Sequence, residues 1–378
     1  MLLCICKSMG QLRIRRRRLS KLEQRRLLEQ LELLCQCGVG IEAIAPSACE
    51  IFRRLLDADS GSVFWQDENG IPMGYYHDNA PAEIKDFFVA NFDALFSDPD
   101  ETNMVGMMLP TAPNIGKALR PGWQESYRAS NVYKYLSQPL GHEYMLDARI
   151  DLDGRGRVLF CAWNKAERPF ATSDIGQARL VHDLVLQALT HQRDEIAWTS
   201  LASRSAHFMT DIAGLRLVAI DAEAEKWLKS AHLLRQNIPM NDNLREAPSF
   251  ARALAAQLPD KAAAEMAIPV AAGRLVIRAV RSAVREGESE TAQVFFSLDM
   301  QRARDVAIID HLCSFPLTMM QKRIALFAAC GGERATCENR FGVSSEALKK
   351  HLNTIYATMN ASKWSDLAEI AEHLSKAG

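Results

Sequence analysis

The sequence predicts an α+β chain in which antiparallel sheets come first and an all-α region of four short helices comes last. Two observations lead to this order. Strand-turn-strand patterns recur up to about residue 300, and the last sixty residues carry only helical spacing. The composition agrees with a folded chain, because 48% apolar and 24% charged residues are typical of proteins with a packed core.

A chain of 378 residues exceeds the usual size of one domain. A polar stretch near residues 194 to 210 separates two groups of strand patterns. We therefore expect five segments: a basic tail with the start of a helix (1–30), a first sheet region (31–195), a second sheet region (205–300), a linker helix (301–316) and the helical region (317–378).

The first sheet region predicts two β-hairpins and the helices around them. Leucines from about Lys21 onward recur at helical spacing, and "IAPSACEIFRRLLDA" predicts a second helix. One hairpin is "GSVFWQDENGIPMGYYH", which turns at "ENG". The other is "HEYMLDARIDLDGRGRVLFCAWN", which turns at Asp153-Gly154. Between them, "PAEIKDFFVANFDALF" predicts a helix.

A closing helix is expected over "PFATSDIGQARLVHDLVLQALTHQ". Thr172 or Ser173 has the residue type of an N-cap, and Asp174 suits the positive end of the helix dipole. Its apolar side chains recur at helical spacing and are expected to be buried: Ile175, Val181, Leu184, Val185 and Leu189.

This order of helix, strands, helical insert, strands and closing helix, with "RPFATSDI" opening the last helix, resembles GAF-like sensor domains over residues 31–195. The resemblance implies an antiparallel sheet with a pocket on one face. Seven aromatic residues are candidates for lining it around a small apolar or aromatic effector: Trp65, Tyr75, Tyr76, Trp123, Tyr127, Tyr133 and Trp163. Plain core packing is the competing interpretation for each of them.

The second sheet region predicts a strand, a helix and several antiparallel strands. The strand patterns lie in "GLRLVAIDAEAEKWL", "EMAIPVAAGRLVIRAVR" and "TAQVFFSLDM", around the helical "FARALAAQL". This order is similar to a reduced PAS-type sensor domain.

The helical region begins at Thr318, a residue type that caps helices, and "CGG" ends its first helix because glycine suits the position beyond a helix end. A second helix, "ERATCENRF", stops at Gly342 and places Cys337 and Phe341 on one buried face. Ser344 then caps a third helix. Its apolar residues recur at spacings of four, three and four: Leu348, Leu352, Ile355 and Met359.

The third helix has a polar outer face. At about 100° per residue, Glu346, Lys350 and Asn353 lie opposite the apolar stripe, and Lys349 flanks it. Residues 317–363 hold seven basic and three acidic residues, a local surplus of 7 − 3 = +4 in a chain of net charge −1. Two helices, a glycine turn and a cationic outer face are what a helix-turn-helix needs to enter a major groove.

The same residues resemble the LuxR-type helix-turn-helix, through Leu317-Thr318, the glycine before the second helix and the phrase "GVSSEALKKHLNTIYATM". Departures from the family pattern predict altered or weaker DNA binding and an unchanged fold. They are Met319-Met320-Gln321 in place of Pro-Arg-Glu, Cys337 in place of isoleucine and Ala347 in place of threonine.

By position, the resemblance places major-groove contacts at Lys349, Lys350 and Asn353. Lysine can bind guanine or phosphate, and asparagine can pair with adenine. Further candidates are Glu346 for a cytosine amino group, Ser344 at the helix start, and His351 for packing or a phosphate. The fourth helix, "SDLAEIAEHLSKA", serves dimerisation in the family, which implies a homodimer through Leu367, Ile370 and Leu374.

Other chemistry is not indicated. The nine cysteines are scattered and lack CxxC or zinc-ligand spacing, which indicates reduced thiols in the cytoplasm, with no metal and no cofactor. No P-loop, GxSxG, HExxH or dinucleotide-binding pattern predicts an enzyme. No apolar run approaches the roughly 18 residues of a membrane span, and the arginine cluster follows the apolar start, unlike a signal peptide.

Two questions stay open on the sequence. The basic cluster at Arg13 and Arg15 to Arg18 suits contact with nucleic acid or an acidic surface, or forms a solvated tail upstream of a second start at Met9. The whole chain is expected to be a bacterial transcription regulator that binds double-stranded DNA under control of a small molecule or protein partner. The alternative is a signalling adaptor whose degenerate helix-turn-helix no longer binds DNA.

Overall fold

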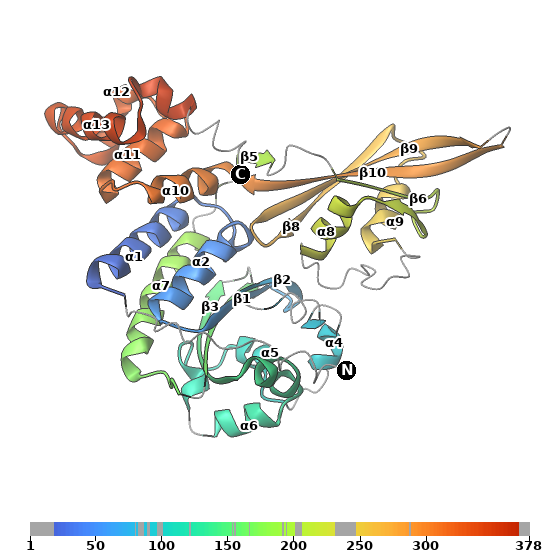
Figure 1. The fold of residues 1–378 in the computed structure, drawn as a ribbon, viewed down its shortest axis with the longest axis horizontal. Coiled ribbons are helices and arrows are strands. Elements are labelled where there is room, and N and C mark those ends of the chain that lie inside the picture. Colours follow the sequence, from blue (N-terminus) through green and yellow to red (C-terminus); the bar gives the residue numbers. More distant parts are fainter. Residues whose placement is uncertain are drawn as a thin grey trace. The chain divides into compact units, whose positions relative to one another are not determined.

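The computed structural model (Figure 1) describes residues 19–79, 81, 87–88, 91–96, 101–120, 122–152, 154, 156–165, 167–190, 193, 195–200, 206–230, 247–286 and 289–369. The chain divides into two compact units, residues 1–28 with 46–187 and residues 29–45 with 188–378. The basic cluster at 13–18 lies outside the described residues. The chain is mixed α+β, with antiparallel sheets and a C-terminal helical region.

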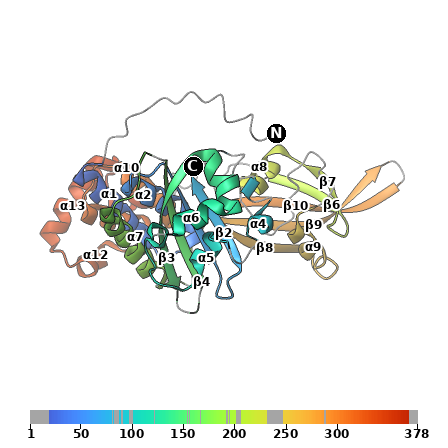
Figure 2. The ribbon, with the colours of Figure 1, turned by 90° about the horizontal axis from the view of Figure 1, so that it is seen from below.

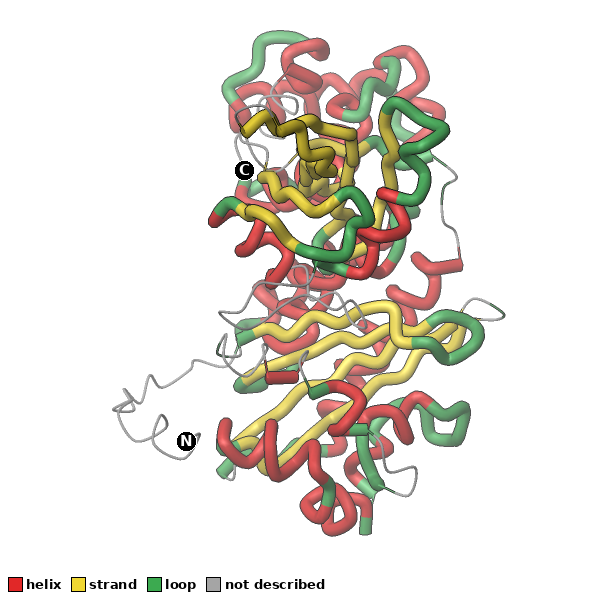
Figure 3. The backbone as a smooth tube through the Cα atoms, turned by 90° about the vertical axis from the view of Figure 1, so that its right-hand side faces the viewer, coloured by secondary structure: helices red, strands yellow, loops and turns green. Residues whose placement is uncertain are grey.

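The first unit contains a four-stranded antiparallel sheet, whose strands lie side by side in Figure 3. Its order is β2-β1-β4-β3, from β1 (Ser60–Gln66), β2 (Pro72–Asp78), β3 (His142–Leu152) and β4 (Gly156–Lys165). Both predicted hairpins are confirmed. The first turns where the Asp67 carboxylate accepts hydrogen bonds from the backbone N–H groups of Asn69 and Ile71, at 3.0 and 2.7 Å.

Strand pairing decides which side chains share a face of this sheet. Ser62 lies opposite His77 on β2, and Trp163 on β4 lies opposite Ser60. Directly paired residues of antiparallel strands point to the same face, and alternate residues point to opposite faces. Ser62, His77 and Trp163 therefore share one face, the cavity face, and Trp65 belongs to the other, the helix face.

The helix face is covered by α2 (Ile41–Leu55) and α7 (Thr172–Thr190). Phe52 of α2 and Phe160 of β4 meet there with ring centroids 5.5 Å apart. Helix α7 begins at Thr172, so the predicted N-cap role of Thr172 or Ser173 is wrong. Both lie in the first turn, and the Asp174 carboxylate accepts the Ala171 N–H at 2.8 Å.

Helix α1 (Lys21–Gln36) confirms the predicted leucine pattern, except that Leu22 is exposed. Its start carries a capping box that the sequence analysis missed. The Glu23 carboxylate accepts the Ser20 N–H at 2.7 Å, and the Ser20 hydroxyl accepts the Glu23 N–H at 3.2 Å. This reciprocal pairing satisfies two backbone donors at the helix end.

An insert of short helices covers the cavity face. It consists of α4 (Phe92–Leu95), α5 (Met104–Met108), η2 (Lys117–Leu119), α6 (Trp123–Ala129), η3 (Tyr133–Ser137) and η4 (Gln138–Leu140). The helix predicted over residues 81–96 is described only in part, and 82–86 and 89–90 lie outside the described residues.

The second unit contains a six-stranded sheet in the order β7-β6-β10-β9-β8, with β5 paired to β10. Its elements are β5 (Trp198–Ser200), β6 (Ala206–Asp211), β7 (Leu217–Ile220), α8 (Ala222–Ser230), α9 (Ser249–Ala255), β8 (Ala263–Val270), β9 (Gly273–Glu286) and β10 (Ser289–Ala303). The stretch 194–210, predicted as a separator, instead contains β5 and β6. Figure 2 shows the β9–β10 hairpin continuing past the other strands.

The core of this second sheet forms around two rings on neighbouring strands. Phe208 of β6 and Phe296 of β10 are paired residues whose rings stack, with centroids 4.4 Å apart. Phe250 of α9 packs edge-on against Phe208 at 6.2 Å. The apolar positions of "FARALAAQL" and "TAQVFFSLDM" thus bury the helix and strand against one another.

The helical region of the second unit comprises α10 (Arg304–Ser314), α11 (Met319–Ala329), α12 (Arg334–Phe341), α13 (Ser345–Met359) and the helical residues 364–369. Helix α11 begins with a capping box, in which the Gln321 side chain accepts the Thr318 N–H at 2.8 Å. No helix among the described residues is long and apolar enough to cross a membrane.

The turn between β3 and β4 offers a matched test of packing. Gly154 and Gly156 both have positive φ, but only Gly156 has no room for a side chain, since a Cβ there would lie 2.0 Å from the Gln66 carbonyl oxygen. We expect Gly156→Ala to lower the free energy of unfolding by about 3 kcal/mol or more, and Gly154→Ala by about 1 kcal/mol. Urea unfolding measures both; equal losses would contradict the close approach.

Candidate functional site

The turn between α12 and α13 is held by backbone geometry and two serines. Gly342 ends α12 in the left-handed conformation, at φ 62°, which favours glycine. The Ser344 hydroxyl accepts the Ala347 N–H at 3.3 Å, so the predicted N-cap is confirmed. Next to it, the Ser345 hydroxyl donates to the Glu338 carboxylate at 2.7 Å and joins the start of α13 to α12.

The inner face of α13 packs as predicted. Leu348, Leu352, Ile355 and Met359 are all buried, in a core that includes Ile324 and Ala328 of α11 and Cys337 of α12. Phe341 is half-buried and meets Phe327 edge-on, with centroids 5.7 Å apart. This core determines which side of α13 faces the solvent.

The outer face of α13 carries the predicted polar residues. Glu346, Lys349, Lys350 and Asn353 are exposed, and His351 is half-buried. Lys350 lies one turn after Glu346 and forms an ion pair with it at 3.2 Å. Among the described residues, Lys349 has no such carboxylate partner, so it is the less compensated of the two lysines.

Part of the surplus of +4 expected for this region is buried or paired with acidic residues. Lys322 is only 4% exposed, and Arg323 pairs with Glu32 at 2.5 Å. Arg340 lies over the Phe327 ring at 5.3 Å, and Lys363 is 3.9 Å from Asp366. A count of charges along the chain overlooked both burial and Glu32, which is distant in sequence.

The expected dimerisation stripe needs correction at Leu367. This side chain is 1% exposed and belongs to the helical core of its own chain, so it is not free to contact a second copy. The neighbouring Trp364 donates its indole N–H to the Gly332 carbonyl at 2.9 Å and holds residues 364–369 against that core. Ile370 and Leu374 lie outside the described residues.

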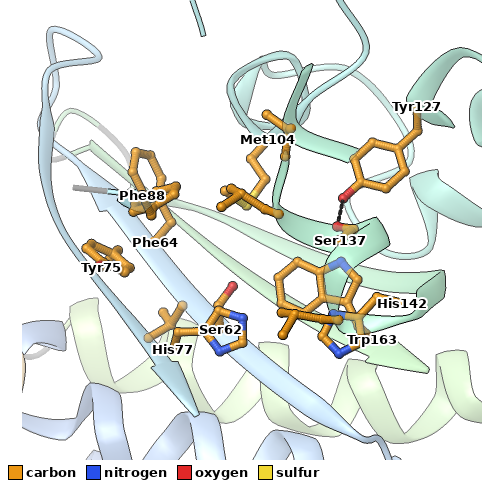
Figure 4. Close-up of a pocket in the computed structure, with 14 residues that line it drawn as sticks. Ser62, Phe64, Tyr75, His77, Phe88, Met104, Tyr127, Ser137, His142 and Trp163 are labelled. Atoms are coloured by element: carbon orange, nitrogen blue, oxygen red, sulfur yellow. Dashed lines mark hydrogen bonds between the residues drawn. The ribbon is translucent and has the colours of Figure 1, made fainter. Parts of the chain in front are cut away.

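The first unit contains a cavity of about 50 Å³ between the cavity face of the sheet and the insert (Figure 4). Its wall is mainly apolar and aromatic. Strands β1, β2, β3 and β4 contribute Ser62, Val63, Phe64, Tyr75, His77, His142 and Trp163; the insert contributes Phe88, Met104, Tyr127, Val132, Leu136, Ser137 and Leu140.

Three of the seven aromatic candidates line this cavity, namely Tyr75, Tyr127 and Trp163, and Tyr76 is not among the lining residues. Trp65 does not line it, because it lies on the helix face, packed over Gly74. Trp123 and Tyr133 contact Tyr127, at centroid distances of 4.8 and 5.6 Å, without reaching the cavity themselves. Trp65 and Tyr133 are buried, as the core-packing interpretation expects, whereas Trp123 is half-buried.

The sequence analysis missed Ser62, His77 and His142. Strand alternation was the signal that could have found two of them, since Ser62 and His77 pair directly and share the face of Tyr75. His142 opens β3 and stacks on Trp163, with centroids 6.1 Å apart, while His77 lies parallel to the same indole at 5.5 Å. The indole is therefore held by two imidazole rings.

Burial sets the protonation of the groups around the cavity. It lowers the pKa of His142 to about 4, so this imidazole is neutral at pH 7 and accepts or donates a hydrogen bond with the Ser60 hydroxyl, 3.0 Å away. Burial also raises the pKa of Tyr127 to about 12. The Tyr127 and Ser137 hydroxyls are 2.6 Å apart.

The Trp163 indole N–H faces this hydroxyl pair. It makes no hydrogen bond of normal geometry with any described residue.

The thiols of the described part of the chain are mostly buried. Its seven cysteines are free thiols, and burial raises the pKa of Cys35 to about 12 and that of Cys161 well above its ordinary value. Such thiols are poor nucleophiles and metal ligands at neutral pH. No group of three or more His, Cys, Asp or Glu side chains suitable for a metal ion occurs among the described residues.

No protein family model matches this chain, and no curated protein matches it. Among solved structures, the chain shows similarity to the crystal structure of the E. coli DhaR(N)-DhaL complex, at 13% sequence identity and a TM-score of 0.18. The match covers 74% of this chain and 91% of that chain. A score this low does not assign a fold or a function.

Two buried groups beside the cavity predict opposite pH dependences. Burial lowers the pKa of His142 from 6.5 to about 4 and raises the pKa of Asp147 from 3.8 to about 6. As the pH falls from 6.5 to 4, the unfolded chain gains the histidine proton first, which destabilises the fold. Over the same range the folded chain gains the Asp147 proton first, which stabilises it. Each effect is worth about 3 kcal/mol.

We therefore expect His142→Gln to become more stable as the pH falls from 6.5 to 4, because only the Asp147 effect remains. Asp147→Asn should become less stable over that range, and the unaltered chain should change less than either variant. Urea unfolding at intervals of one pH unit measures all three. Parallel pH profiles for the two variants would contradict the assignment.

Proposed function

We propose that this chain is a transcription regulator that binds double-stranded DNA through α12 and α13, in the manner of a LuxR-type helix-turn-helix. The observation that carries the proposal is the arrangement of α13. Its serine-capped start follows a left-handed glycine, its apolar stripe is buried, and Lys349, Lys350 and Asn353 are exposed together on the outer side. This is what a helix entering a major groove requires.

The length and polarity of α13 are consistent with this role. Fifteen residues span about 22 Å at 1.5 Å each. Lys349 is free to reach a phosphate or guanine, whereas Lys350 must exchange the Glu346 carboxylate for DNA. That exchange would leave Glu346 available to a cytosine amino group.

One departure from the LuxR-type pattern has a structural substitute. Gln321 stands where the family carries an acidic residue, and its side chain makes the same reciprocal cap with Thr318 at the start of α11. The helix that precedes the reading pair therefore begins normally. Ala347 has no comparable substitute, because a methyl group cannot donate a hydrogen bond to a phosphate.

We further propose that the N-terminal sheets act as GAF-like and PAS-like sensors. The cavity of the first unit supports a small-molecule effector, which would change the activity of the DNA-binding helices by favouring one arrangement of a homodimer.

A protein-interaction adaptor is the second candidate, and the compensated charge favours it. Of the seven basic residues between 317 and 363, Lys322 is buried, and Arg323, Lys350 and Lys363 have acidic neighbours. A surface with little net positive charge releases few counterions and binds nucleic acid weakly.

Gel retardation with the full-length chain separates the two candidates. We expect binding of genomic fragments that weakens as salt is added, with selected fragments identified by sequencing. Lys349→Ala with Lys350→Ala should abolish it or reduce the salt dependence by about two phosphate contacts. Lys226→Ala, which removes another exposed lysine paired with a glutamate, is the control. Absence of retardation by any fragment would rule out the regulator and leave the adaptor.

A further inference from the structure

We propose that strand β7 pairs with β7 of a second copy of this chain, so that the two six-stranded sheets join edge to edge in a homodimer. Among the described residues β7 has a strand on one side only, because it is the first strand in the order β7-β6-β10-β9-β8. The inference rests on the homodimer of the proposed function and names the surface through which it forms. Association is measured without DNA, so it can fail while DNA binding stands, and the reverse.

The first argument is the direction of the backbone groups of β7. Asp221, which follows the strand, donates its N–H to a carbonyl of β6 at 3.0 Å. The Arg216 carbonyl, just before the strand, accepts an N–H of β6 at 3.0 Å. Consecutive residues of an antiparallel pair turn their N–H and C=O groups alternately toward the partner and away from it. The backbone groups of Leu217 and Ile220 therefore point away from β6, to the open edge.

A β-bulge brings these two residues to the same edge. Leu217 and Ala219 pair with consecutive residues of β6, so Val218 is the extra residue of the bulge. In a regular strand Leu217 and Ile220 would face opposite edges, because they are three residues apart. The bulge thus leaves β7 with two N–H and two C=O groups directed to its open edge.

One register lets two copies satisfy all these groups. In the stretch "RLVAID", a twofold axis between Val218 and Ala219 places Leu217 opposite Ile220 of the second copy, and the reverse. Both strands carry the same bulge, so the spacing of the outward groups matches. Each copy then donates two hydrogen bonds to the other and accepts two.

Charge selects the same register, which is the second argument. It places Arg216 of each copy opposite Asp221 of the other copy, and opposite charges across an antiparallel pair are stabilising. Arg216 is exposed and has no acidic partner among the described residues. The Asp221 side chain accepts the Ala224 N–H at 2.6 Å but stays 43% exposed. A carboxylate has room for a further donor.

The third argument is the contrast between the two edges of this sheet. The opposite edge strand, β8, carries exposed Glu265 and Pro269, residue types that prevent pairing at an edge. Strand β7 has only apolar residues. Val218 is 51% exposed, and Ala219 is exposed beside it. Pairing places Val218 against Ala219 of the second copy and removes this apolar surface from water.

The direct test is sedimentation velocity together with hydrogen exchange of the full-length chain over a range of concentrations. We expect a monomer–dimer equilibrium in which the amides of residues 216–221 exchange more slowly as the dimer forms, because the Leu217 and Ile220 N–H groups become hydrogen-bonded. A dimer without added protection over 216–221, or a monomer at every concentration, would overturn the proposal.

Charged substitutions at the two edges supply the matched control. Val218→Lys places two like charges at the centre of the interface and should abolish the dimer. Ala267→Lys makes the same change at an exposed position of β8 and should leave it intact. Arg216→Glu turns two attractive pairs repulsive and should weaken association about tenfold. Thermal unfolding verifies that each variant folds.

These variants also define the contrary results. An unchanged dimer in Val218→Lys would show that the copies associate through another surface. Equal loss in Val218→Lys and Ala267→Lys would show that added charge acts without regard to the edge. Either result rejects the pairing of β7, whereas gel retardation of DNA by the same variants reports separately on the helix-turn-helix.

Discussion

The buried carboxylate of Asp147 ties the insert to the edge of the sheet, and the path of the chain back into β3 depends on this link. It accepts the Ala118 N–H at 2.7 Å, while the Asp147 carbonyl accepts the Gly116 N–H at 2.9 Å. Arg149, two residues on and on the same face, donates to the Thr111 carbonyl at 2.9 Å. Together with the antiparallel bridge between Ile115 and Ala148, they hold residues 111–118 against the edge strand β3 and so attach the insert to the sheet.

Burying the Asp147 carboxylate costs free energy, and the polar groups around it offset part of that cost. Burial disfavours the charged form of Asp147 and raises its pKa to about 6, although the backbone donors oppose the shift. The compensation is local, because three backbone N–H groups and the Lys117 ammonium favour the carboxylate. Asp147 lies beside the cavity and not within it, and the described residues of the cavity wall include no aspartate, glutamate, lysine or arginine.

The helical region obeys a comparable constraint. Its core sets the orientation of α13 through Leu348, Leu352, Ile355 and Met359. The same core takes up Leu367, so stability within one chain uses a side chain that the family resemblance assigned to dimerisation. Contacts such as Arg323 with Glu32 also reduce the charge available for DNA. The helices that would contact DNA are therefore the same helices that form the core of this region.

By itself, the sequence determined the features that depend on local periodicity. The hairpins, the Ser344 cap, the inner stripe of α13 and its exposed lysines follow from alternation, turn residues and a 100° rotation, which operate within a few residues. The tertiary structure decided the rest. Trp65 and Trp163 have the same residue type, but strand pairing places them on opposite faces, and Lys322 and Leu367 are buried in the folded chain. Whether an aromatic residue lines the cavity, or a charged side chain reaches solvent, depends on the residues around it. Only the tertiary fold brings those residues together.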